Sequence, residues 1–119
     1  MILIVDDDQS VCSILTRFLK KEEYETETVN FGLAGVAAFK EKKPSLVFLD
    51  IKLPDISGIE VLRRIKEIER GTPVIMITGN TDADCVLSAF RLGACDCIFK
   101  PFDFNYLKGA IKTLIGNRK

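Results

Sequence analysis

Continuous apolar runs separated by amphipathic stretches constrain the fold of this chain more than any other feature. Four runs are almost wholly apolar: "ILIV" at 2–5, "LVFL" at 46–49, "VIMIT" at 74–78 and "CIF" at 97–99. A parallel strand covered on both faces has this continuous apolar character, whereas a strand with one solvated face alternates. A fifth segment, "ETETV" at 25–29, does alternate, which suits an edge strand.

The segments between these runs have the spacing of helices. Helices are predicted at 9–22, 31–42, 58–69, 82–92 and 104–115, with Asp8 as a plausible N-cap of the first. Strands that alternate with helices predict an α/β fold, a doubly wound five-stranded parallel sheet with helices on both faces. A chain of 119 residues has the size of one compact domain, and we expect 1–119 to form it.

Charge and hydropathy exclude several classes of function. Seventeen Lys and Arg balance seventeen Asp and Glu, and no basic run marks a nucleic-acid or anionic-membrane footprint, so direct DNA binding is not expected. No apolar stretch is long enough to span a membrane, and Met1 leads into the first apolar run without the basic region of a signal peptide. We therefore expect a cytoplasmic protein.

The cysteine spacing and the lack of histidine narrow the chemistry further. Cys12, Cys85, Cys95 and Cys97 show no C-x-x-C pair, and the chain has no histidine. A mixed zinc site and imidazole-based catalysis are thus excluded, and buried reduced thiols are expected instead. Any phosphohistidine that takes part in the chemistry belongs to a partner.

Polar residues gather where the predicted strands end. They are Asp6, Asp7 and Asp8 after the first strand, Asp50 after the third, Thr78 at the end of the fourth and Lys100 after the fifth. The binding site of an open parallel sheet lies at these carboxyl ends. Taken singly, each residue has an ordinary structural explanation, such as a helix cap or a turn hydrogen bond. Together they indicate a site.

The combination suits phosphoryl transfer. Two or three carboxylates bind Mg²⁺ and leave positions open for water and phosphate oxygens. Asp50 is then free to act as the nucleophile. Mg²⁺ and the Lys100 ammonium neutralise phosphoryl oxygens, and the Thr78 hydroxyl donates a hydrogen bond to another.

Four motifs carry a family resemblance that extends over essentially the whole chain: "ILIVDDD", "LVFLDIKLPDISGIEVL", "VIMITG" and "IFKPF". In this order and spacing they resemble the receiver domains of two-component response regulators, above all single-domain phosphorelay regulators and the receivers of transcription activators. The resemblance implies a flavodoxin-like (β/α)5 fold with strand order 2-1-3-4-5, an order for which a receiver is a known example.

The resemblance also implies roles at the site. Asp6 and Asp7 form an acid pair, in which Asp7 binds Mg²⁺ directly and Asp6 acts mainly through water. Asp50 is the phosphoacceptor and second ligand, and the Lys52 backbone carbonyl is the third. Asp8 more simply begins the following helix.

Further implications concern the partners and the phosphoryl group. Thr78 and Lys100 contact that group, and the Lys100–Pro101 bond is cis. The phosphodonor is a sensor histidine kinase or a phosphotransfer protein, and the chain catalyses only its own phosphorylation and dephosphorylation. A downstream output domain or protein binds the face formed by 82–115, and the resemblance allows a phosphorylation-dependent dimer.

The chain departs from the family pattern in places. Cys97 stands where receivers usually carry a switching Tyr or Phe, so coupling through a moving ring is not expected. Lys52 and Asn80 occupy variable positions that either tune access of the hydrolytic water or are simply solvated.

Other classes fit part of the pattern. Asp6-x-Asp8 matches the D-x-D motif of haloacid dehalogenase-like phosphatases, but that class needs a later acidic metal motif and leaves Asp50 unexplained. A flavodoxin-like redox module needs a phosphate-binding loop after the first strand, where carboxylates repel a flavin phosphate. A degenerate receiver that serves only as a scaffold stays open, although every key position is filled.

Overall fold

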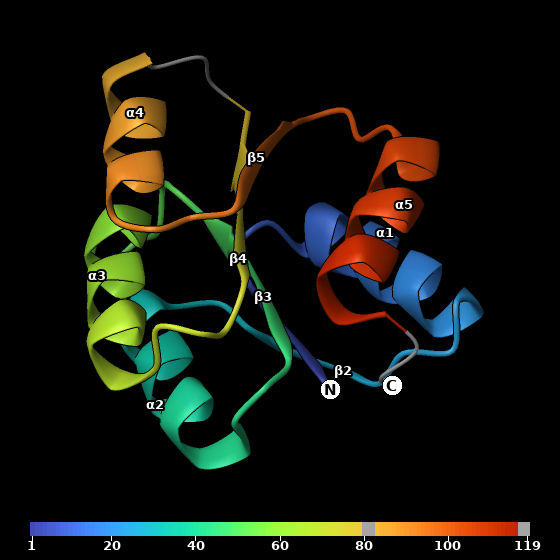
Figure 1. Ribbon diagram of the computed structural model, residues 1–119, viewed down its shortest axis with the longest axis horizontal. Helices are drawn as coiled ribbons and strands as arrows, with labels where there is room; N and C mark the ends of the chain where they lie inside the picture. Colours follow the sequence, from blue (N-terminus) through green and yellow to red (C-terminus); the bar gives the residue numbers. More distant parts are fainter. Residues whose placement is uncertain (80–82, 117–119) are drawn as a thin grey trace.

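The computed structural model describes residues 1–79 and 83–116 and shows one parallel sheet between two layers of helices (Figure 1). Its strands are β1 (Ile2–Val5), β2 (Thr26–Val29), β3 (Leu46–Asp50), β4 (Val74–Thr78) and β5 (Asp96–Phe99). They lie in the order β2-β1-β3-β4-β5, and every neighbouring pair is parallel. The predicted α/β class, flavodoxin-like topology and strand order are confirmed.

Helices cover both faces of this sheet. On one face lie α1 (Gln9–Lys21) and α5 (Phe104–Ile115), and on the other α2 (Gly32–Lys42), α3 (Gly58–Ile68) and α4 (Ala83–Arg91) (Figure 1). The predicted helix bounds agree with these to one residue, except that residue 82 lies outside the described residues. No helix among the described residues is long and apolar enough to cross a membrane.

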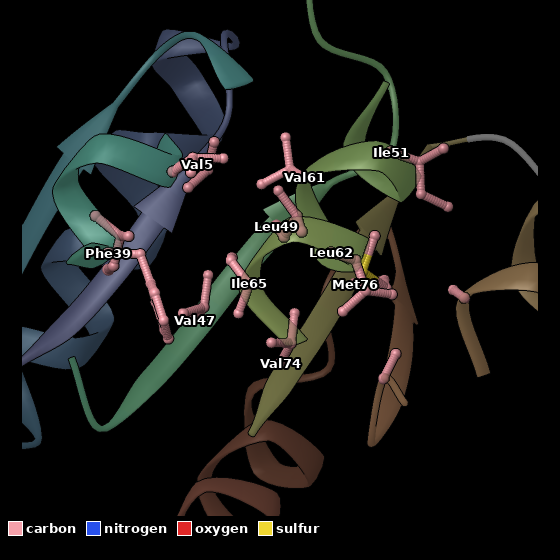
Figure 2. Packing of buried hydrophobic residues seen from close by; sticks show 14 of the residues in the cluster. Val5, Phe39, Val47, Leu49, Ile51, Val61, Leu62, Ile65, Val74 and Met76 are labelled. Atoms are coloured by element: carbon pink, nitrogen blue, oxygen red, sulfur yellow. The ribbon is translucent and has the colours of Figure 1, made fainter. Parts of the chain in front are cut away.

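The continuous apolar runs fill two cores, because alternate residues of a strand point to opposite faces. Leu49 and Met76 meet Leu62 of α3 in the first core, shown in Figure 2. Their strand neighbours Phe48 and Ile75 face the opposite way, toward α1 and α5. These five residues are fully buried, and each such side chain contributes about 1.5–3 kcal/mol relative to an exposed one.

Strand β5 departs from the expectation of a strand covered on both faces. It is an edge strand, Phe99 is 45% exposed and Cys97 only half-buried, while Ile98 alone of its residues is buried. The expectation of buried thiols was likewise wrong in part. All four cysteines are thiols outside any disulfide, but Cys12 is buried whereas Cys95 is exposed. Short apolar runs do not distinguish an edge strand from a central one.

Candidate functional site

Asp6 is held rigidly where β1 ends. It is completely buried, its backbone N–H donates to the Val29 carbonyl at 3.1 Å, and its own carbonyl accepts from the Asn30 side chain at 2.9 Å. Its Oδ1 accepts a hydrogen bond from the Asp8 N–H at 2.9 Å, while its Oδ2 is buried without a hydrogen-bond partner among the described residues. An unsatisfied buried carboxylate oxygen is costly and is typical of a site that expects a cation.

Asp8 has a different task from its two neighbours. Its carboxylate accepts from the N–H groups of Ser10 and Val11, so it is the N-cap of α1, as predicted. The D-x-D alternative needs this carboxylate to work beside Asp6 on a substrate. The structure instead commits it to the helix.

Asp50 is the last residue of β3 and is only 6% exposed. Its Oδ1 accepts a hydrogen bond from the Lys52 N–H, two residues on, at 3.2 Å. Helix α3 begins close by, since a Cβ on Gly58 would lie 1.9 Å from the Asp50 carbonyl oxygen. Only glycine allows the backbone to approach Asp50 so closely.

The predicted acid pair and Asp50 come together as one cluster. Carboxylate oxygens of Asp6, Asp7 and Asp50 lie within 4.8 Å of one another, with Asp7 exposed and the other two buried. Hard oxygen ligands in this number, with one orphaned buried oxygen among them, fit Mg²⁺. The donor set is therefore suited to the predicted ion.

Lys100 and Thr78 complete this edge of the sheet. The Lys100 Nζ lies 3.6 Å from Asp6 Oδ2 and 3.8 Å from Asp50 Oδ2, so one ammonium faces both buried carboxylates. Thr78 is buried at the end of β4, and its carbonyl accepts from the Lys100 N–H at 3.0 Å. The predicted cis bond between Lys100 and Pro101 is present.

The crowding of acids changes the ionisation of Asp50. Burial, followed by the neighbouring carboxyl of Asp6, raises the pKa of Asp50 to about 7, against the opposing attraction of Lys100. The carboxyl thus favours protonation while no cation is bound. A divalent cation would reverse that preference.

Lys52 and Asn80 are the two variable positions that the sequence analysis places beside the site. The side chain of Lys52 is exposed, and only its backbone N–H contacts Asp50. Asn80 lies outside the described residues.

A contact that sequence reasoning missed anchors the loop 51–57, between β3 and α3. The Asp55 carboxylate accepts from the N–H groups of Gly32 and Leu33, at 2.7 and 2.9 Å, and these hydrogen bonds lower its pKa. Helix α2 has no side-chain cap of its own at Phe31. The aspartate after a Pro was the available signal, but nothing local links it to residues 22 and 23 positions earlier.

A second missed contact lies beside Cys97. The Tyr106 hydroxyl of α5 donates a short hydrogen bond to the Asp96 carboxylate of β5. Cys97 packs against the first core, and a hollow of about 240 Å³ beside it is lined in part by Phe99 and Tyr106. A ring is therefore present on this face, but it comes from the neighbouring helix.

Solved structures and curated proteins place this geometry in context. The chain is similar to a CheY-like receiver domain protein from Methanospirillum hungatei, with a TM-score of 0.90, 33% identity and coverage of 94% of this chain and 90% of that one. The receiver domain of NtrX from Brucella abortus gives a TM-score of 0.91 at 33% identity, covering 99% of this chain and 100% of that chain.

Curated relatives differ in length. The DNA-binding response regulator MtrA of Mycobacterium tuberculosis is 40% identical over 101 residues, which are 85% of this chain but 44% of that protein. Sporulation initiation phosphotransferase F of Bacillus subtilis is 36% identical over 114 residues, 96% of this chain and 92% of that protein. The chain thus spans less than half of one relative and nearly all of the other.

The family model for the response regulator receiver domain matches residues 2–112, which include every residue of the carboxylate cluster and both Thr78 and Lys100. The fold, the order of the motifs and the acidic edge agree with that match. The chain therefore belongs to the receiver domain family of two-component response regulators.

Proposed function

We propose that residues 1–119 act as one receiver domain in which Asp50 accepts a phosphoryl group from a phosphohistidine of a sensor histidine kinase or phosphotransfer protein. The observation that carries this proposal is the convergence of Asp6, Asp7 and Asp50 within 4.8 Å, with Lys100 facing both buried carboxylates.

The chemistry follows from the positions of the side chains. An Asp50 carboxylate oxygen attacks phosphorus, the P–N bond to the partner imidazole breaks, and an acyl phosphate forms on Asp50. The Lys100 ammonium pairs with a phosphoryl oxygen in place of Asp50, and the Thr78 hydroxyl donates to another. The chain in this way catalyses only its own phosphorylation and, with water as the attacking group, its dephosphorylation.

Asp6, Asp7, Asp50 and the Lys52 carbonyl would hold Mg²⁺. When bound, the ion supplies positive charge that neutralises the carboxylates and the phosphoryl oxygens. Asp6 Oδ2 supports this assignment, because it faces the Lys100 ammonium at 3.6 Å but has no hydrogen-bond partner among the described residues, and a bound cation or its water would satisfy it.

The output is a change on a partner-binding surface formed by α4, β5 and α5, which we call the output face. Lys100 directly follows β5, so a phosphoryl group that draws its ammonium toward Asp50 acts on this strand. Exposed apolar side chains on this face, Leu87, Phe90, Phe99 and Tyr106, are suited to a protein partner. That partner is an output domain, another protein or a second copy of the chain.

The test is intact mass after incubation with acetyl phosphate and Mg²⁺. Wild type should gain one phosphoryl group, Asp50→Ala should gain none, and chelation of Mg²⁺ should abolish the gain. Asp103→Asn, a change of an exposed acid that caps α5, is the matched control and should be labelled like wild type. Equal labelling of Asp50→Ala would refute the assignment.

A further inference from the structure

The loop 51–57 carries the Lys52 carbonyl, and its two ends are well fixed. The Gly58 N–H donates to the Ile51 carbonyl at 2.8 Å, and the Lys52 N–H donates to Asp50 at 3.2 Å. The Ser57 side chain accepts from the Ile59 N–H and caps α3. These contacts join the loop to its own flanking elements only.

The middle of the loop is fixed to a different part of the molecule by Asp55. Both of its carboxylate oxygens are used, Oδ1 by the Gly32 N–H at 2.7 Å and Oδ2 by the Leu33 N–H at 2.9 Å. Ile56 packs beside this contact, since a Cβ on Gly32 would lie 2.6 Å from its Cγ1. A negative charge at a helix N-terminus is also favoured by the helix dipole.

Packing holds the loop only in part: Ile51, Leu53 and Ile56 pack against the first core, but the loop also borders open space. It forms one wall of a hollow of about 480 Å³, and Thr78 and Cys85 line that hollow from β4 and α4. Proline and exposed polar residues make up much of the loop. Without the Asp55 contacts, its middle has room to shift.

We propose that Asp55 is a positioning residue for the metal site, which holds the Lys52 carbonyl toward the carboxylate cluster by tying loop 51–57 to the first turn of α2. This rests on the proposed function, which assigns the Lys52 carbonyl to Mg²⁺. Asp55 is ionised at neutral pH as any ordinary aspartate is, and its hydrogen bonds to the α2 amides lower its pKa further. Groups hydrogen-bonded directly to a metal ligand commonly change metal affinity by about 10–100-fold, and Asp55 acts on its ligand indirectly, through the loop, so we expect an effect at the lower end.

The experiment compares Asp55→Ala and Asp55→Asn with wild type and with Ser57→Ala, which removes a cap from the same loop but no link to α2. Mg²⁺ affinity is measured by NMR titration, the folding stability without Mg²⁺ by urea, and the tie itself by amide exchange at Gly32 and Leu33. We expect Asp55→Ala to exchange these amides faster and to bind Mg²⁺ about tenfold more weakly. Asp55→Asn, which keeps one accepting oxygen, should lie between.

The outcomes separate this inference from the proposed function. If wild type binds Mg²⁺ and is phosphorylated on Asp50 but Asp55→Ala binds Mg²⁺ equally well, the positioning role alone is refuted. If Ser57→Ala lowers the affinity for Mg²⁺ as much as Asp55→Ala does, the general order of the loop controls affinity and not the contact with α2. The inference then also fails. A wild-type protein that binds no Mg²⁺ overturns both. Should Asp55→Ala not fold, Asp55→Asn gives the same comparison.

Discussion

The carboxyl edge of the sheet and the outer surface of α3 treat charge in opposite ways. At the edge, three carboxylates lie within 4.8 Å of one another and one ammonium faces two of them, all but Asp7 and Lys100 being buried. On α3, Glu60 is paired with Arg63 and Arg64 in water. The edge keeps an unbalanced charge that a ligand can neutralise, while the helix surface is already neutralised.

The same regions differ in how closely the backbone packs. A Cβ on Gly58 would overlap the Asp50 carbonyl oxygen, whereas a Cβ on Gly109, on the outside of α5, would meet nothing within 4 Å. The site therefore combines close backbone packing with like-charged carboxylates held near one another. The outer helix surfaces have neither feature. The difference teaches that the fold accepts unfavourable charge at this edge, as the proposed binding of a cation and a phosphoryl group requires.

Gly58→Ala should have the largest effect. Its Cβ would lie 1.9 Å from a backbone oxygen that cannot rotate away, so β3 or α3 must shift. We expect a loss of at least about 3 kcal/mol in the free energy of unfolding, measured by urea denaturation. A loss similar to that of an ordinary surface substitution would show that the backbone at the site is more adaptable than it looks.

Asp50→Asn should stabilise the Mg²⁺-free protein. Folding raises the pKa of Asp50 from an ordinary 3.8 to about 7, so the fold favours the protonated form. The resulting penalty is absent below about pH 4, grows up to about pH 7 and is complete above it. The upper limit is about 4 kcal/mol, and because Asn still buries a polar group we expect a gain on the order of 2 kcal/mol.

The check is the difference in unfolding free energy between Asp50→Asn and wild type at several pH values. It should grow from pH 4 to 7 and shrink when Mg²⁺ is added, since the proposed binding of the ion would stabilise the native wild type. If the difference does not change with pH, the fold does not disfavour the ionised form of Asp50.

Gly109→Ala should raise stability. Glycine inside a helix costs about 0.5–1 kcal/mol relative to alanine, and here the added methyl group has open space around it. Urea denaturation should show a free energy of unfolding higher by about that amount, and thermal unfolding a higher midpoint temperature, in contrast to Gly58→Ala. A loss of stability would indicate that the space around Gly109 is not open in the folded protein.

Glu60→Gln should have the smallest effect. The Arg63 and Arg64 guanidiniums hold the pKa of the exposed Glu60 at about 2, so whatever this pairing contributes is present above about pH 4.5 and lost as the pH falls toward 2. Exposed pairs of this kind contribute little and are screened by salt. Urea denaturation should show a small loss in the free energy of unfolding of Glu60→Gln that disappears in about 1 M NaCl. The gain in the free energy of unfolding of Asp50→Asn should largely persist at that salt concentration.

The sheet and the site could be predicted because both depend on local order in the sequence. Continuous apolar runs identified β1, β3 and β4, and parallel strands necessarily bring their carboxyl ends, with Asp6, Asp50 and Thr78, to one edge. The order of the strands in the sheet, in contrast, could be predicted only from the family resemblance. Apolar composition alone could not place β5 at an edge, because that depends on the strand order, and it could not show that Phe99 is exposed, because that depends on which helices cover the strand.

The contacts of Asp55 and Tyr106 could not be predicted for a related reason. Asp55 reaches α2 across 22 residues, and Tyr106 reaches Asp96 from another element. Such contacts depend on the angle and register at which helices pack on the sheet. Residue type and spacing along the chain carry no information on either.

The hydrogen bond between Tyr106 and Asp96 gives the output face an intrinsic spectroscopic probe, the absorbance of Tyr106. The chain has no tryptophan and only two tyrosines, so its near-ultraviolet absorbance comes almost entirely from Tyr24 and Tyr106. The bond to Asp96, together with that residue's charge, raises the pKa of the Tyr106 phenol. In a Tyr24→Phe background, the pH at which phenolate absorbance develops therefore reports whether β5 and α5 are still joined.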